Sequence, residues 1–129
     1  MMERTTFPNY TSADVRAGLP YDAFRQFANL LDLTQQEAAR LLFIPERTRV
    51  RRRHEGRFTQ AESDRLVRLT QLIRQAADAF NGHLPEAVAW LTTPKTLLGD
   101  ETPLQHADTE PGLADVRDML SVIQYNAAA

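Results

Sequence analysis

Helix start signals recur along this chain and constrain its fold more than any other feature of the sequence. Thr34 with Glu37, and Thr59 with Glu62, have the T-x-x-E spacing of a capping box. In that motif the threonine oxygen accepts a hydrogen bond from a backbone N–H, and the glutamate reaches back to the cap. No segment shows the sustained alternation of apolar and polar residues that a half-buried strand needs. The sequence therefore predicts an all-α protein.

Apolar residues at helical spacing indicate where the helices lie. A stripe from Leu66 to Phe80 predicts a long helix that ends at Gly82 and joins the two halves of the chain. Shorter stripes, opened by prolines or threonine caps, predict further helices. The expected helices cover approximately residues 20–32, 35–42, 46–54, 60–82, 85–91 and 110–126. Residues 1–18 show no such stripe, and we expect them to form a flexible N-terminal arm.

Chain length and composition restrict the class of protein. A chain of 129 residues buries one substantial core but not two large ones. No stretch approaches the roughly 20 consecutive apolar residues that a membrane span needs. The first ten residues lack the apolar core of a signal peptide, and cysteine is absent, so neither disulfides nor a thiolate zinc site are expected. We therefore expect a cytoplasmic protein with no membrane partner.

The net charge of −2 conceals a division of charge along the chain. Residues 40–74 contain ten arginines and four acidic residues, a net charge of +6. Residues 75–129 contain two basic and eight acidic residues, a net charge of −6. Because a positive field attracts phosphate and a negative field repels it, this division indicates two surfaces with different partners.

The segment from Leu33 to Gly56 has the layout of a helix-turn-helix motif. A capped short helix is followed by a tight connection and a second helix of similar length. Ala39 lies where a small residue lets the two helices approach, whereas Phe43 occupies the turn position that often holds glycine. This layout predicts that the second helix enters the major groove of DNA.

Arginines cover most of the circumference of that second helix. The first turn is expected to meet base edges, and the other arginines to meet phosphates. The alternative is a solvated helix face, balanced by acidic residues such as Glu46 and Glu55. The predicted DNA-binding residues are Arg47, Thr48, Arg49, Arg51, Arg52, Arg53 and Arg57.

The sequence offers no convincing catalytic centre, so we expect a protein that is not an enzyme and needs no cofactor or metal. The three histidines are too scattered for a metal site of the usual spacing. Two pairs of acidic residues are candidates for acid–base chemistry, but such pairs in loops are more often solvent-facing or helix-capping groups. These pairs are Asp100 with Glu101, and Asp108 with Glu110.

Five segments in register carry a resemblance to a known family. They are IPERT (44–48), GRFTQAESDRLVRL (56–69), AVAWLTTP (87–94), LLGDETPLQHADTEPG (97–112) and VRDMLSVIQYN (116–126). With these segments the chain resembles the Xre/MbcA/ParS-type antitoxins of RES–Xre toxin–antitoxin systems. The resemblance covers roughly two-thirds of the chain and begins at Ile44.

The resemblance implies a helix-turn-helix DNA-binding domain over residues 19–82 and a C-terminal toxin-binding domain over residues 83–129. It implies an antitoxin that neutralises a RES-domain, NAD-degrading toxin by blocking its active site with its own C-terminal region. It also implies a homodimer, higher toxin–antitoxin assemblies, and repression of its own operon through operator DNA. The toxin-binding residues that it implies are Ser121, Gln124, Tyr125 and Asn126.

One position departs from the family pattern. Arg49 stands where the family usually has an aliphatic residue, and Val50 is expected to take over its packing role. The alternative function is a stand-alone helix-turn-helix transcriptional repressor whose C-terminal domain only dimerises.

Overall fold

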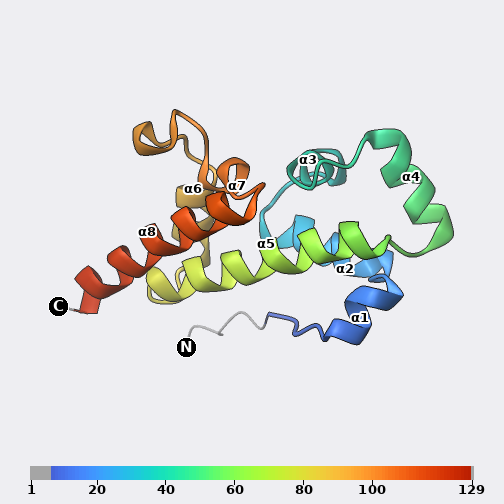
Figure 1. Ribbon diagram of the computed structural model, residues 1–129, viewed down its shortest axis with the longest axis horizontal. Coiled ribbons are helices and arrows are strands. Elements are labelled where there is room, and N and C mark those ends of the chain that lie inside the picture. Colours follow the sequence, from blue (N-terminus) through green and yellow to red (C-terminus); the bar gives the residue numbers. More distant parts are fainter. Residues whose placement is uncertain (1–6, 129) are drawn as a thin grey trace. The chain divides into compact units, whose positions relative to one another are not determined.

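The computed structural model describes residues 7–128, and every regular element in this range is helical (Figure 1). Two isolated β-bridges, Pro20 with Arg57 and Lys95 with Glu101, are the only β structure in this range. The prediction of an all-α fold is confirmed. The elements are α1 (Ser12–Ala17), α2 (Tyr21–Leu30), α3 (Gln35–Leu41), α4 (Glu46–Glu55), α5 (Gln60–Ala79), α6 (Leu84–Leu91), the 3-10 helix η1 (Thr96–Leu98), α7 (Pro103–His106) and α8 (Glu110–Ala128).

The described chain divides into two compact units, residues 8–70 and residues 71–128 with Phe7. The division falls within α5, whereas the sequence predicted a boundary after residue 82. The apolar stripe of α5 explains this difference, because it contributes buried residues to each unit. Leu66 is buried in the first unit, and Ile73 is buried in the second.

Helix α1 lies in the segment that was expected to be a flexible arm. The Thr11 hydroxyl accepts from the Asp14 backbone N–H at 3.1 Å, and the Asp14 carboxylate accepts from the Thr11 N–H at 2.8 Å. This capping box starts the helix, and its T-x-x-D spacing was the signal in the sequence. The helix ends at Gly18, where φ is 86° and an added Cβ would lie 2.2 Å from the Phe58 carbonyl oxygen. Residues 1–6 of the expected arm lie outside the described residues.

The core of the first unit combines aromatic residues of α2 with apolar residues of α3 and α5. The rings of Tyr21, Phe24 and Phe58 form a cluster with centroid separations of 5.4 to 5.5 Å. These three residues and Phe27 are buried, as are Ala38, Ala39, Leu42, Ile44 and Leu66. Pairs of aromatic rings in such tilted or stacked arrangements add about 0.5–1.5 kcal/mol beyond their buried area.

The turn between α3 and α4 is a Schellman motif. The Ile44 N–H donates to the Ala39 carbonyl at 2.9 Å, and the Phe43 N–H donates to the Arg40 carbonyl at 3.1 Å. Phe43 has a φ of 57°, in the left-handed region where glycine is the usual residue. Its neighbours Leu42 and Ile44 are buried, so they hold the turn in place. The structure therefore has the two-helix layout that the sequence predicted, despite the absence of glycine.

The second unit packs α6, α7 and α8 with the C-terminal part of α5. Its core contains residues from every one of these helices and from η1, and none of the following side chains is more than 8% exposed. They are Leu72, Ile73, Ala76, Ala87, Leu91, Leu98, Leu104, Leu113, Val116 and Leu120. Of the inward positions predicted on α8, Val116 and Leu120 are buried and Ile123 is partly exposed. No helix within residues 7–128 is long and apolar enough to span a bilayer.

Candidate DNA-binding helix and C-terminal surface

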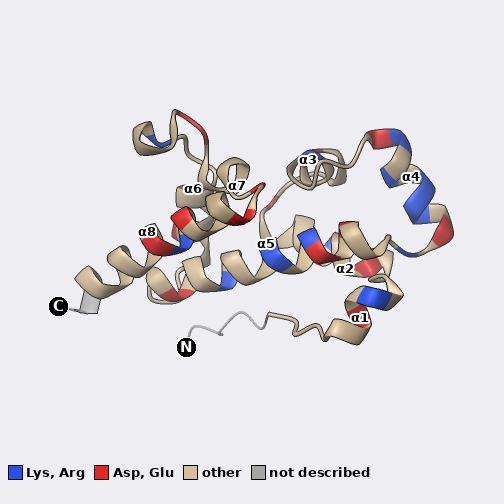
Figure 2. Cartoon of the chain, in the orientation of Figure 1, with Lys and Arg blue, Asp and Glu red and all other residues tan. Residues whose placement is uncertain are grey.

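Helix α4 follows the Schellman turn and is densely basic, as Figure 2 shows. Arg47, Arg51 and Arg53 are exposed, and within the described chain neither Arg47 nor Arg53 has a hydrogen-bond or ion-pair partner. Arg51 makes an ion pair with Glu55 at 3.7 Å, and both side chains are more than half exposed. Such a surface pair is weak and leaves the guanidinium available to another anion.

Arg49 points into the first unit rather than toward solvent. Its Nη1 donates to the Tyr21 hydroxyl at 2.8 Å and to Gln35 Oε1 at 3.1 Å. Its Nε donates to Glu46 Oε2 at 2.7 Å, and its Nη2 pairs with the other oxygen of that carboxylate. The hydrogen bond with Glu46 raises the pKa of Arg49. We call Tyr21, Gln35, Glu46 and Arg49 the Arg49 network.

The expectation that Val50 replaces Arg49 as the packing residue is wrong. The Val50 side chain is exposed, at 40%, whereas the Arg49 side chain is only 11% exposed. The guanidinium satisfies its donors on neighbouring helices, so the position can face inward without an aliphatic residue. The sequence could not reveal this, because Tyr21 and Gln35 are remote from Arg49 along the chain.

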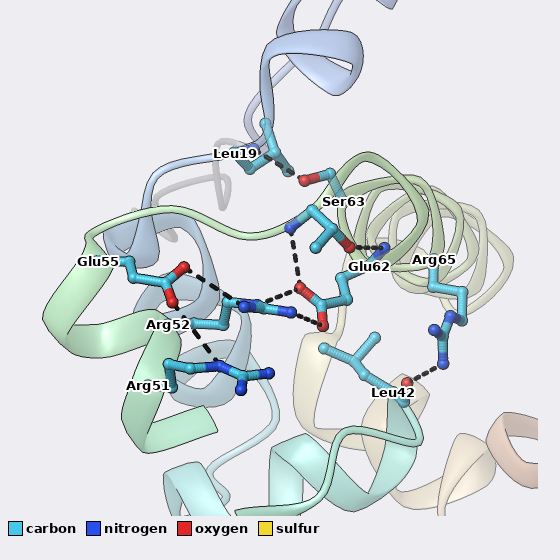
Figure 3. Close-up of polar contacts among 9 residues, drawn as sticks. Leu19, Leu42, Arg51, Arg52, Glu55, Glu62, Ser63 and Arg65 are labelled. Carbon is cyan, nitrogen blue, oxygen red and sulfur yellow. Dashed lines mark hydrogen bonds and ion pairs between the residues drawn. The ribbon is translucent and has the colours of Figure 1, made fainter. Parts of the chain in front are cut away.

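Arg52 is also held within the first unit (Figure 3). Its Nε and Nη2 donate to the two oxygens of Glu62 at 2.8 and 3.2 Å, and its Nη1 pairs with Glu55 at 3.3 Å. Glu62 also completes the capping box of α5, since it accepts from the Thr59 N–H at 2.8 Å and its own N–H donates to the Thr59 hydroxyl. Burial acts to raise the pKa of Glu62, but the hydrogen bonds from Arg52 and Thr59 outweigh burial and lower it.

Two further arginines donate to backbone carbonyls. Arg57 Nη1 donates to the Gly18 oxygen at 2.8 Å, and Arg65 donates to the Leu42 oxygen, as Figure 3 shows for Arg65. The predicted DNA-binding residues therefore differ in their surroundings. Arg47, Arg51, Arg53 and Arg57 are exposed, and Thr48, Arg49 and Arg52 are partly buried. Arg51 pairs with exposed Glu55, whereas Arg49, Arg52 and Arg57 are hydrogen-bonded to other parts of the first unit.

The end of α8 carries the four predicted toxin-binding residues. Ser121, Gln124, Tyr125 and Asn126 are all exposed, and Tyr125 is 76% exposed. The Ser121 hydroxyl donates to the Arg117 carbonyl, so this serine is already bonded to its own helix. These residues continue the helix beyond the buried part of α8 and present a solvent-facing surface.

Two apolar residues of the second unit are exposed and were not predicted to be so. Val122 on α8 is more than half exposed, and Leu97 in η1 is 88% exposed. Val122 lies off the inward stripe of α8, and this spacing was the signal that could have identified it. No comparable signal exists for Leu97, because the neighbouring Leu98 is buried and looks the same in sequence.

His106 contacts two acidic side chains of the second unit. The Nε2 atom of His106 lies 3.0 Å from Asp115 Oδ2, and its Nδ1 atom lies 3.7 Å from Glu101 Oε1. The hydrogen bond with Asp115 raises the pKa of His106. Within the described residues no group of three histidine or acidic side chains could hold a metal ion. His106 therefore joins α7 to α8 through its hydrogen bond with Asp115, and it lies close to Glu101 of the preceding loop.

Comparison with known proteins matches both units to one class. Residues 12–71 match the antitoxin Xre-like helix-turn-helix domain, and residues 75–125 match the antitoxin Xre/MbcA/ParS C-terminal toxin-binding domain. A helix-turn-helix domain followed by a toxin-binding domain defines an antitoxin.

Two curated relatives specify the family. The chain is 31% identical over 112 residues to antitoxin Xre of Yersinia enterocolitica, covering 86% of this chain and 76% of the relative. It is 31% identical over 117 residues to antitoxin Xre of Photorhabdus laumondii, covering 90% of this chain and 79% of the relative. The chain belongs to the Xre antitoxin family, which confirms the resemblance seen in its motifs.

Proposed function

We propose that this antitoxin neutralises a RES-domain toxin that degrades NAD and represses its own operon by binding operator DNA through α4. It acts in the cytoplasm by binding, with no reaction of its own. The observation that carries the proposal is the position of Arg47, Arg51 and Arg53, which are exposed on the second helix of a helix-turn-helix. Family membership supports the toxin half of the proposal.

The DNA half rests on the chemistry of guanidinium groups. Arginine pairs with phosphate oxygens through charge and with guanine edges through two parallel hydrogen bonds. The exposed arginines of α4 are available for both kinds of contact, whereas Arg49 and Arg52 are engaged within the protein. We therefore narrow the primary DNA contacts to Arg47, Arg51 and Arg53, with Thr48 and Arg57 beside them.

The DNA half is tested by measuring affinity for the DNA upstream of the protein's own gene at several salt concentrations. Each phosphate contact contributes about 0.9 to the slope of log affinity against log salt. We expect each of the variants Arg47→Ala, Arg51→Ala and Arg53→Ala to lower that slope by up to about 0.9. The full decrease is expected where the arginine contacts a phosphate. Arg16→Ala changes an exposed arginine on α1 and is the matched control. Affinity that does not depend on salt contradicts this half.

The toxin half rests on the exposed end of α8. Leu113, Val116 and Leu120 anchor the helix in the core, so the residues that follow are carried on a rigid support. We propose that Ser121, Gln124, Tyr125 and Asn126 enter the active site of the toxin and exclude NAD. Tyrosine suits such a contact, because it supplies a large apolar ring and a polar tip with little conformational freedom to lose.

The toxin half is tested by expressing a neighbouring RES-domain gene with variants of this protein and measuring growth and cellular NAD. We expect a chain that lacks residues 121–129 to lose rescue, and Tyr125→Ala to weaken it. Glu86→Ala changes an exposed residue on α6 and serves as the matched control. Full rescue by the truncated chain contradicts active-site blocking. A chain that binds DNA but no toxin supports the stand-alone repressor instead.

The proposal includes a homodimer that presents two α4 helices to a two-fold operator. The half-sites should lie about 34 Å apart, one turn of DNA, or a multiple of this spacing. Light scattering gives the mass in solution, and footprinting gives the spacing of the protected half-sites. A monomer that protects one half-site contradicts the dimer.

A further inference from the structure

Helix α4 differs from its neighbours in having no buried residue at all. Helices α2 and α3, by contrast, each place apolar side chains in the core. Most helices in proteins are oriented by an apolar face packed on the core, and α4 has no such face. Its rotation about its own axis must therefore come from polar contacts.

Two guanidinium groups of α4 make such contacts: Arg52 bonds to Glu62 at the start of α5, and Arg49 bonds to α2 and α3 through the Arg49 network. Arg49 bonds to Tyr21 on α2, to Gln35 on α3 and to Glu46 on α4 itself. The Tyr21 hydroxyl in turn donates to Gln35 Oε1. The Tyr21 ring is held by stacking against Phe58, with centroids 5.5 Å apart, so its hydroxyl has a fixed position. Hydrogen bonds thus join α2, α3 and α4, and the planar guanidinium of Arg49 fixes the directions of the bonds that it donates.

These bonds are sensitive to the rotation of α4. On a helix of radius about 2.3 Å, a rotation of about 30° moves each Cα by about 1.2 Å, and atoms farther from the axis by more. A displacement of that size along the 2.8 Å bond between Arg49 and Tyr21 takes the two atoms beyond hydrogen-bond distance. The same rotation displaces Arg47 and Arg51, which lie on the exposed side of α4.

We propose that the Arg49 network sets the rotation of α4 and thereby determines which side chains of α4 read operator DNA. Arg49 and Tyr21 are positioning residues that touch no DNA. This inference rests on the proposed DNA binding by α4. It deepens that proposal, because it assigns DNA contact to the exposed arginines of α4 and assigns their orientation to Arg49.

Tyr21→Phe is the sharpest perturbation. It removes one hydroxyl and keeps the ring, and Tyr21 is only 3% exposed, so it is not available to DNA. In the free protein we expect the amide hydrogens of α4 to exchange several-fold faster with solvent, while those of α2 change little. Unchanged exchange in α4 overturns the inference whether or not the protein binds DNA.

The second measurement compares a duplex from upstream of the protein's own gene with a scrambled duplex of the same composition. We expect Tyr21→Phe to lower affinity for the first duplex about three- to tenfold, as the loss of one hydrogen bond allows. Affinity for the scrambled duplex and the salt slope should not change. Arg51→Ala, by contrast, should lower affinity for both duplexes and reduce the slope by about 0.9 if Arg51 meets a phosphate.

Arg49→Lys distinguishes a positioning role from direct contact. It keeps the positive charge but loses the planar set of donors, so we expect the same loss of discrimination as for Tyr21→Phe with an unchanged slope. The double variant should be no worse than Arg49→Lys alone, because both changes disable one network. Retained discrimination in Arg49→Lys, or a slope reduced by about 0.9 in Arg49→Ala, overturns the inference. If the unaltered protein fails to distinguish the two duplexes, the proposed operator binding fails instead, and the exchange result still stands.

Discussion

Glu62→Ala removes the side chain that ties α4 to the start of α5. The carboxylate accepts three hydrogen bonds, two from Arg52 and one from the Thr59 backbone. Its side chain is 10% exposed and that of Arg52 is 13% exposed, so water replaces few of the lost contacts. Arg52 keeps its ion pair with Glu55 at 3.3 Å, and this partner limits the damage.

The expected loss follows from these contacts. Loss of the backbone hydrogen bond that completes the cap costs about 1 kcal/mol. Removal of one partner from a buried ion pair costs about 3–5 kcal/mol when the remaining charge has no other partner. Because Arg52 keeps its ion pair with Glu55 and is slightly exposed to water, loss of the Arg52–Glu62 pair should cost less, about 2 kcal/mol. The free energy of unfolding should therefore fall by about 3 kcal/mol.

Urea unfolding followed by far-ultraviolet circular dichroism measures this loss. Arg51→Ala is the matched control, because it removes an exposed ion pair of the same helix and should cost less than about 0.5 kcal/mol. A double-mutant cycle with Arg52→Ala should show that the two changes are not additive. A loss below about 1 kcal/mol for Glu62→Ala, or strict additivity with Arg52→Ala, would refute the reasoning.

Two other predictions concern pH and backbone conformation. The hydrogen bond with Asp115, helped by Glu101, raises the folded-state pKa of His106 above its ordinary value of 6.5. The stabilisation that protonated His106 provides is therefore complete below about pH 6.5 and is lost as pH rises through the folded-state pKa. Over this pH range the free energy of unfolding in urea should fall by about 0.5 kcal/mol, and this fall should be absent in His106→Gln. Gly18→Ala places a Cβ 2.2 Å from the Phe58 carbonyl at a φ of 86° and should cost at least about 2 kcal/mol in the same assay. An unchanged midpoint in either experiment contradicts the corresponding structural argument.

The helix starts were predictable because their signals are local. The capping boxes at Thr34 and Thr59 place both partners within four residues, and the structure has both boxes. The capping box at Thr11 is equally local, but it contains aspartate in place of glutamate and was not predicted. A longer apolar stripe also predicted α5, although that stripe could not show that two compact units share the helix.

The arrangement of the arginines was not predictable, because it depends on residues far apart in sequence. Arg49, Arg51 and Arg53 look equivalent in a run of basic residues. Only the folded chain brings Tyr21 and Gln35 to Arg49, and Glu62 to Arg52. Charge counting predicted a basic helix but could not show that Arg49 and Arg52 are hydrogen-bonded within the protein.

The capping boxes also bear on how quickly the chain folds. Within the described residues, four helices begin with a reciprocal pair of hydrogen bonds made inside a four-residue segment, namely α1, α3, α5 and α7. Contacts between residues close in sequence form with little loss of chain entropy, and helical proteins rich in them fold in microseconds to milliseconds. During synthesis these helix starts can form as soon as their own residues leave the ribosome. The long-range arginine contacts need residues that emerge later, since Arg49 lies 28 residues beyond Tyr21.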